Sequence, residues 1–151
     1  MFLLKHFFDF DGRLSRGQYF FHQLILLSIF LLLLLLLLQM RDDLMISQSI
    51  FAVGSVLLYL GLIISELSAA SRRFQDMGRK KNMIWLLFVP FVNAYWSIVL
   101  LFKRGEEGRN IFGEDPLELI SSGNAFNIRF LTFIFLFTLT LDILLIYFVR
   151  N

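Results

Sequence analysis

Four arginines and one aspartate are the residues of this chain best suited to form ion pairs or to bind an anion. Arg13 and Arg16 precede a long apolar run, and Arg72, Arg73 and Asp76 follow the next one. An arginine three or four residues before an aspartate forms the weaker kind of intrahelical pair, so we expect Asp76 to pair across the chain with Arg13 or Arg16. The group is then either a structural clamp between two helix ends or a phosphate site for anionic lipid headgroups.

Catalytic, metal and cofactor chemistry find little support in the sequence. The chain has no Cys, which excludes disulfides, thiol catalysis and thiolate metal ligands, and its 2 His are not spaced as a pair. The glycine-rich stretch 105–113 lacks the lysine and the following helix start that a phosphate-binding loop requires. The sequence therefore predicts a protein that is not an enzyme and that holds no metal and no cofactor.

Four long apolar runs, at residues 18–40, 49–69, 83–102 and 128–149, fill most of the 151 residues. Each has about the 20 residues that a helix needs to cross the hydrocarbon core of a bilayer. A soluble domain of this size cannot bury a composition that is 58% hydrophobic and 17% aromatic. We therefore expect a single all-α membrane domain: an integral bundle of four transmembrane helices with an amphipathic N-terminal segment at residues 1–11.

The positions of the basic residues predict an orientation, because positive charge concentrates on the cytoplasmic side of a membrane. With four full spans and a cytoplasmic N-terminus, 9 of the 14 Lys and Arg lie inside. If residues 83–102 instead form a hairpin bent at residues 90–93, entering and leaving on one face, 12 lie inside. Two half-helices of about nine residues reach only about 13 Å each, so we favour a kinked full span over the hairpin.

Local signals predict the ends of the first two helices. Ser15 and Gln18 have the spacing of a capping box, in which each side chain bonds the backbone N–H of the other residue. The first helix should therefore begin at Arg16. Gly78 suits the left-handed cap that ends a helix, so the second helix should stop there.

Two further caps are predicted around the third apolar run. Asn82, just before this run, is the expected N-cap of its helix. In the polar segment that follows the run, Asp115 stands directly before Pro116. A capping residue followed by proline predicts a short surface helix at residues 116–122.

Small residues form a stripe along the second predicted helix. Within about 40° of one line, at about 100° per residue, lie Ser47, Gly54, Gly61, Ser65 and Ser68. Small side chains let helix backbones approach closely, and such faces drive helix packing in membranes. We expect the stripe to pack against another helix of the same chain, with a dimer face as the alternative.

Asp142 lies in the last apolar run, where an ionisable side chain is costly and indicates either a function or a buried partner. Thr138, one turn earlier on the same face, and Asn93 are the expected hydrogen-bond partners. Two interpretations stand: a packing acid held by hydrogen bonds, or a proton or cation relay. A relay normally uses several titratable groups, and the first and third runs supply no further buried acid.

The three polar segments, in their order and spacing, resemble a known family. They read FDFDGRLSRGQYF at residues 8–20, RRFQDMGR at 72–79 and GEEGRNIFGEDP at 105–116. This combination resembles the DUF805 family of small bacterial inner-membrane proteins over about residues 5–116, which leaves a last transmembrane helix at 124–151 as an addition. Gln18, Phe20 and Gln75 stand where the family pattern has Glu, Trp and His. The absence of that His removes a group that titrates near neutral pH.

The resemblance implies a multi-pass protein of the bacterial inner (plasma) membrane, with no biochemical role that can be carried over. We expect a non-catalytic scaffold or partner subunit whose basic cytoplasmic face contacts anionic lipids or another membrane protein, including a second copy of the chain. The alternative is a small transporter or channel component with Asp142 and Asn93 in a polar path. Membrane proximity explains the basic clusters, so no nucleic-acid partner is expected.

Overall fold

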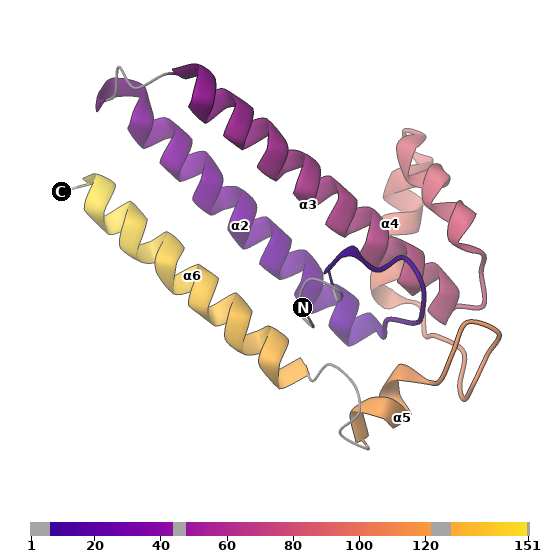
Figure 1. The fold of residues 1–151 in the computed structure, drawn as a ribbon. Coiled ribbons are helices and arrows are strands. Elements are labelled where there is room, and N and C mark those ends of the chain that lie inside the picture. Colours follow the sequence, from indigo (N-terminus) through magenta and orange to yellow (C-terminus); the bar gives the residue numbers. More distant parts are fainter. Residues whose placement is uncertain (1–6, 44–47, 122–127, 151) are drawn as a thin grey trace.

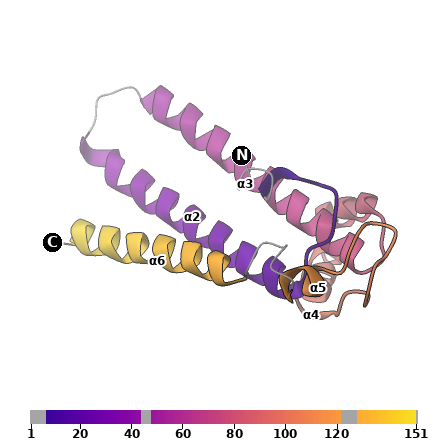
Figure 2. The same cartoon turned by 60° about the horizontal axis from the view of Figure 1, so that its bottom comes forward.

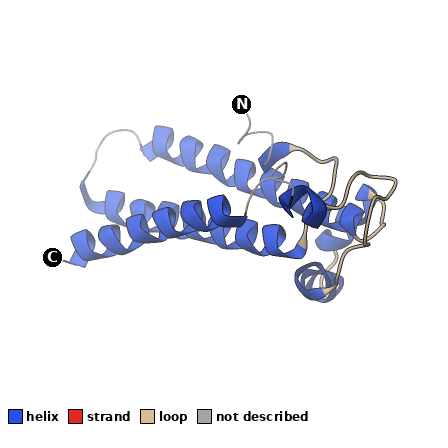
Figure 3. Ribbon diagram, turned by 90° about the horizontal axis from the view of Figure 1, so that it is seen from below, coloured by secondary structure: helices blue, strands red, loops and turns tan. Residues whose placement is uncertain are grey.

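The fold is built of helices, and the all-α class predicted from the sequence is confirmed. The computed structural model describes residues 7–43, 48–121 and 128–150, and no strand occurs in these ranges (Figure 3). The elements, in chain order, are α2 (Arg16–Asp43), α3 (Gln48–Asp76), the 3₁₀ helix η1 (Lys81–Phe88), α4 (Val92–Phe102), α5 (Pro116–Ser121) and α6 (Ile128–Arg150).

Three long helices lie side by side, with α2 between α3 and α6 (Figures 1 and 2). Two spans are long and apolar enough to cross a membrane, Arg16–Leu36 in α2 and Ala52–Asp76 in α3. In the most apolar windows of these spans only 22% and 17% of the residues are buried, so the helices turn most of their apolar side chains outward. A core helix of a soluble protein is mostly buried, and the exposure here therefore suggests a membrane protein.

The predicted capping box at the start of α2 is confirmed. The backbone N–H of Ser15 donates to Oε1 of Gln18 at 3.0 Å, and the backbone N–H of Gln18 donates to Oγ of Ser15 at 3.3 Å. Because these bonds satisfy two N–H groups that the first turn leaves without helical partners, α2 begins at Arg16 as expected.

The predicted end of α3 at Gly78 is also confirmed. Gly78 has a φ of +70°, in the left-handed region that glycine adopts without strain. Its N–H bonds the carbonyl of Gln75 at 3.1 Å, and the N–H of Arg79 bonds that of Phe74 at 2.9 Å. These two bonds make a Schellman motif, which closes the helix.

Of the two remaining predicted caps, one is wrong and the other is confirmed. The 3₁₀ helix η1 has Lys80 as its N-cap, so the expected capping role of Asn82 is wrong. Asp115 does cap α5, because its Oδ1 accepts from the N–H of Leu117 at 2.9 Å. The short surface helix at Pro116 is therefore confirmed.

The expectation that residues 83–102 form a single kinked span is wrong, because the segment 81–102 forms two separate helices. The segment leaves the end of α3 after Gly78, runs as η1, reverses, and returns as α4 beside it (Figure 1). Its far end comes back to its starting point, because Arg73 near the end of α3 donates to the carbonyls of Leu100, at 2.8 Å, and Lys103. Each arm extends about 16 Å, roughly half of a hydrocarbon core of about 30 Å.

Pro90 and Asn93 explain where this hairpin, η1–α4, reverses. Pro90 has no N–H to continue a helical ladder, and Phe91 after it has a φ of +65°, which costs a non-glycine residue about 1–2 kcal/mol. The N–H of Val92 bonds the carbonyl of Pro90 at 2.8 Å, and Nδ2 of Asn93 donates to the carbonyl of Leu87 at 2.7 Å. These internal bonds supply partners to groups that the helical ladder does not satisfy at the turn.

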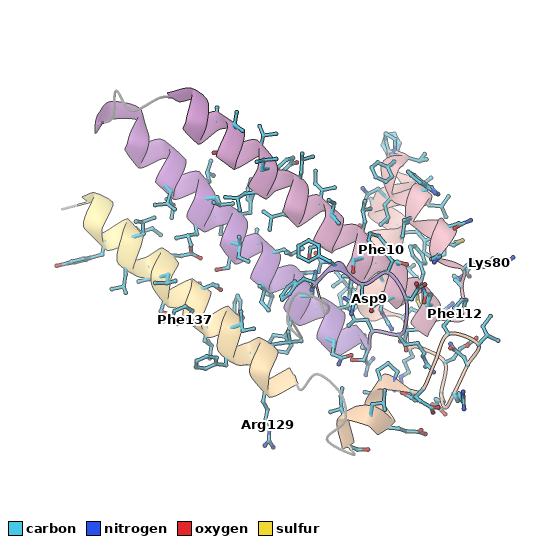
Figure 4. The ribbon with its side chains drawn as sticks, in the orientation of Figure 1. Asp9, Phe10, Lys80, Phe112, Arg129 and Phe137 are labelled. Atoms are coloured by element: carbon cyan, nitrogen blue, oxygen red, sulfur yellow. The ribbon has the colours of Figure 1, made fainter. Side chains whose placement is uncertain are left out.

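The residues before α2 lie across α3 as a strap, residues 7–15. Oγ of Ser68 donates to the carbonyl of Asp9, and Oγ of Ser71 donates to that of Phe10 at 2.8 Å. Figure 4 shows Asp9 and Phe10 over α3. Part of the small-residue face of α3 thus receives backbone from the strap instead of another helix.

Gln75 fastens the strap by two bonds from one buried amide. Its Oε1 accepts from the N–H of Gly12 at 3.1 Å, and its Nε2 donates to the carbonyl of Phe10 at 2.8 Å. An amide is donor and acceptor at once, and no pH change in the physiological range removes either function. Gln75 therefore holds the strap by bonds that do not titrate.

Replacing Gln75 by Leu should lower the free energy of unfolding by about 1–3 kcal/mol, because partly buried backbone groups of the strap lose their partners. Lys81→Ala is the matched control. Lys81 bonds Asp11 of the same strap at 2.9 Å, but this pair is exposed and should contribute no more than about 1 kcal/mol. Thermal unfolding of the detergent-purified variants measures both effects. An equal loss in the two variants would contradict the attachment through Gln75.

Candidate functional site

Polar residues from separate segments meet at the end of α3. Asp76 lies between two arginines: Nε of Arg13 is 3.1 Å from its Oδ1, and Nη1 of Arg73 bonds its Oδ2. The side chains of Arg13, Arg73 and Asp76 are 1%, 0% and 4% exposed. Buried charges are tolerated only when they are paired and hydrogen-bonded. We call these three residues the Asp76 clamp.

Arg13 joins the strap to the loop between α4 and α5. Its remaining N–H groups bond the carbonyls of Glu106, Gly108 and, at 3.5 Å, Gly113. A guanidinium has five N–H donors in a fixed plane, so one side chain can organise several carbonyls of a loop. The loop is thereby folded around the Arg13 side chain.

Arg73 joins α3 to the strap and to the base of the hairpin. Besides Asp76, it bonds the carbonyls of Leu100, Lys103 and, at 3.5 Å, Leu14. Leu100 lies in the last turn of α4 and Lys103 is the residue that caps it, and at this end of a helix carbonyls lack helical partners. The clamp therefore supplies bonds that the end of α4 lacks.

The loop adds two bonds of its own. Nδ2 of Asn110 donates to the carbonyl of Gln75 at 2.9 Å, and the buried Asp115 accepts from the N–H of Gly108 at 2.9 Å. Asp115 is also close enough to act electrostatically on Asp76. A second buried aspartate therefore lies near the Asp76 clamp.

Close approach explains two glycines of the motif segments. A Cβ on Gly105 would lie 2.0 Å from Oδ2 of Asp76, and a Cβ on Gly78 would lie 2.0 Å from Oε1 of Glu106. Atoms do not approach so closely, so a side chain at position 105 would displace the carboxylate. Asp76 cannot move away without leaving its arginines.

The structure brings Arg13, Arg73 and Asp76 together. The expected pairing of Asp76 with Arg13 is present, and Arg73, the weaker candidate by spacing, pairs as well. Arg16 is exposed and lines a pocket of about 330 Å³ at the start of α2, whereas Arg72 is buried. Because Arg13 and Arg73 expose almost no side-chain surface, a lipid phosphate cannot reach them in this arrangement.

Asp142 is buried, at 4% exposed, but the partners expected for it are wrong. Its Oδ2 accepts from Oγ of Ser28 on α2 at 2.6 Å. Thr138 donates to carbonyls of its own helix, and Asn93 bonds within the hairpin. Among the described residues α6 packs on α2 and makes no contact with the hairpin, whose arms pack on α3 and α2, so Asp142 and Asn93 are not in contact.

The small-residue stripe of α3 is divided into a packed part and an open part. Ser65 is buried and contacts a histidine of α2 at 3.2 Å, and Ser68 is buried under the strap. A Cβ on Gly54 or Gly61 would meet nothing within 4 Å. Internal packing thus accounts for the serines but not for the glycines, and Ser47 lies outside the described residues.

Glu66 of α3 was not expected from the sequence as a site residue. Its Oε1 accepts from the hydroxyl of Tyr19 at 3.2 Å, and its Oε2 accepts from Nε2 of Gln23 at 2.7 Å. Tyr19 and Gln23 lie one turn apart on α2, so both face α3. Two polar residues at this spacing in an apolar run were the signal that could have indicated a buried partner.

The chain is thus an all-helical protein with two helices long and apolar enough to cross a membrane, and a buried Arg–Asp clamp joins its segments at one end. The sequence model of one family, described as "Protein of unknown function (DUF805)", matches residues 7–114, more than half of the chain. The chain therefore belongs to the DUF805 family, as its polar segments indicated. No curated protein and no solved structure matched it. The matched region contains the strap, the clamp and the hairpin, and ends before α6.

Gly105→Ala should lower the free energy of unfolding by about 1–3 kcal/mol, because the added methyl group overpacks a buried, charged contact. Gly61→Ala is the control, since it adds the same atom in open space. It should be neutral or stabilise by up to about 1 kcal/mol, because alanine is the better helix former. Thermal unfolding in detergent measures both. A Gly105→Ala protein as stable as the unmodified chain would contradict the contact with Asp76.

Proposed function

We propose that the chain is a multi-pass protein of the bacterial inner membrane. In this arrangement α2, α3 and α6 cross the bilayer, and the hairpin enters and leaves on one side. The 23 residues of α6 extend about 34 Å, enough for a hydrocarbon core of about 30 Å. Large apolar side chains support the same location: Phe137 points outward from α6 (Figure 4), and Phe91 at the hairpin tip is 92% exposed.

The placement of charge supports an orientation with the clamp end in the cytoplasm. Because the hairpin returns to its starting side, residues 103–127 join the N-terminal side of the membrane. Twelve of the 14 Lys and Arg then lie on that side, and Arg41 and Arg150 lie on the other. This is the distribution that the positive-inside rule favours.

The role that we propose is that of a non-catalytic scaffold. The observation that carries it is that the polar motif residues are used for internal bonds: Arg13 and Arg73 are buried and bond Asp76 and backbone carbonyls. A motif used in this way fixes the strap, the loop and the hairpin base relative to one another.

The clamp leaves an exposed basic rim at the hairpin base, consisting of Arg79, Lys80, Lys81, Lys103 and Arg104. Figure 4 shows Lys80 at the edge of the molecule, pointing away from the helices. In the proposed orientation this rim contacts the phosphates of anionic lipids. The outer face of α3 stays available to another membrane protein or to a second copy of the chain.

Introduced cysteines test the topology, because the chain has none of its own. Lys80→Cys and Arg109→Cys should react with a membrane-impermeant maleimide only from the cytoplasmic side, and Arg150→Cys only from the opposite side. Four full spans would give the reverse result at Arg109 and Arg150. Labelling of Arg109→Cys from outside intact cells would therefore contradict both the return of the hairpin and the proposed topology.

Charge reversal tests the rim. Lys80→Glu combined with Lys103→Glu should remove the enrichment of phosphatidylglycerol around the protein, because each base near the surface contributes about 1 kcal/mol of attraction to anionic lipid. Arg41→Glu combined with Arg150→Glu makes the same change in net charge at the other end and should leave the enrichment intact. Lipids co-purified in polymer-bounded nanodiscs can be quantified by mass spectrometry. An equal effect of the two double variants would rule out a specific rim.

A further inference from the structure

A groove of about 490 Å³ lies between α2, α3 and the tip of the hairpin. Its volume falls in the range of about 300–1,000 Å³ that is usual for small-molecule sites. One part of it holds the carboxylate of Glu66 together with the hydroxyl of Tyr19 and the side-chain amide of Gln23, which both bond that carboxylate. This part of the groove is not used by the clamp or by the rim.

Most of the apolar wall that α2 and α3 give to the groove lies on one side of Glu66. On α2 the apolar lining residues follow Gln23, and on the antiparallel α3 all of them except Leu67, the next residue after Glu66, precede Glu66. The residues on this side are Leu26, Leu27, Phe30, Leu62 and Ile63. Both sets therefore extend from the polar part away from the clamp end. In the proposed orientation this direction leads from the cytoplasmic headgroup zone toward the centre of the bilayer. The groove has the polarity gradient of a lipid.

The polar part of the groove is suited to a cation. Among the lining residues Glu66 is the only charged one, and no Arg or Lys is present to receive an anion. Each Glu66 oxygen accepts one hydrogen bond, from Tyr19 or from Gln23. A carboxylate oxygen can accept a second bond, so an ammonium group can be added without breaking the existing ones.

The groove also opens sideways. Leu27, Phe30 and Tyr59, which line it, are 53%, 42% and 53% exposed. In a bilayer these surfaces face lipid, so a molecule of the membrane can enter the groove without passing through the protein.

We propose that the groove holds one ethanolamine phospholipid of the surrounding bilayer. Its ammonium group bonds Glu66, its phosphate stays at the open mouth in the headgroup zone, and one acyl chain lies along α2 and α3. The proposal rests on the membrane location proposed above, but it concerns a different site and a different headgroup from the basic rim.

Native mass spectrometry of the protein in a non-ionic detergent tests the headgroup. The probes are phosphatidylethanolamine and phosphatidylcholine with the same acyl chains, which differ only by methylation of the amine. The trimethylated amine has no N–H to donate, so the ethanolamine lipid should bind about tenfold more tightly. Equal affinity for the two lipids would overturn the proposal.

Two acid-to-amide variants locate the site. Glu66→Gln removes the charge and keeps the size of the side chain, and it should abolish the preference for the ethanolamine lipid. Asp142→Asn makes the same chemical change at an acid that does not line the groove, and it should leave the preference at about tenfold. A preference that survives Glu66→Gln, or that falls equally in Asp142→Asn, would refute this assignment.

A third variant tests the acyl chain without touching the bonds of Glu66. Leu27→Trp enlarges a half-exposed side chain in the apolar wall, and it should weaken binding of the ethanolamine lipid about tenfold or more by filling the groove. Unchanged binding would contradict the proposed path of the chain, even if Glu66→Gln fails to fold. Lipid binding in detergent does not depend on topology, and cysteine labelling does not depend on Glu66, so the two proposals can fail separately.

Discussion

The burial of one carboxylate between two guanidinium groups is the interaction on which the clamp end of the molecule depends. Removing Asp76, Arg13 and Arg73 from water is costly, and only mutual pairing together with further hydrogen bonds compensates for it. The further bonds go to backbone carbonyls of the strap, of the last turn of α4 and of the loop. A local ion pair thereby acquires a long-range structural effect, because each arginine bonds chain segments that are distant in sequence.

The hairpin and the groove follow from this clamp. Arg73 holds the end of α4 against α3, so residues 81–102 must return to the side from which they left. Next to this point the ring of Trp96 in α4 lies 5.2 Å from the ring of Phe74 in α3 and 5.0 Å from the guanidinium group of Arg79 just after α3. The fixed length of the arms then places Phe88 and Asn93, near the hairpin tip, in the wall of the groove that contains Glu66. The clamp at one end thus helps to shape the groove farther along the helices.

Much of the fold could be predicted from short-range signals, and the remainder depended on contacts that no local pattern contains. The capping box at Ser15 and the glycine cap at Gly78 were readable because they involve neighbouring residues. The pairing of Asp76 with Arg13 could be expected because Arg72 and Arg73, on the same helix as Asp76, have the less favourable spacing for an ion pair. The hairpin was not favoured, because it depends on bonds from Arg73 to backbone carbonyls of α4. Every residue has such a carbonyl, so the sequence does not show which of them accept a bond from a distant side chain. The contacts of Glu66 and the Ser28–Asp142 pair were missed for a similar reason. Each contact depends on which faces of two helices meet, and a sequence does not state how one helix is rotated relative to another.

A double-mutant cycle on Asp76 and Arg13 tests the clamp most directly. Asp76→Asn alone should lower the free energy of unfolding in detergent by about 3–5 kcal/mol, because it leaves two buried arginines without a counter-charge. Adding Arg13→Gln removes one of those charges, so the double variant should be destabilised by at least 1 kcal/mol less than the sum of the two single variants, roughly as expected for coupled neighbours. Additive losses, or an Asp76→Asn protein as stable as the unmodified chain, would contradict the account.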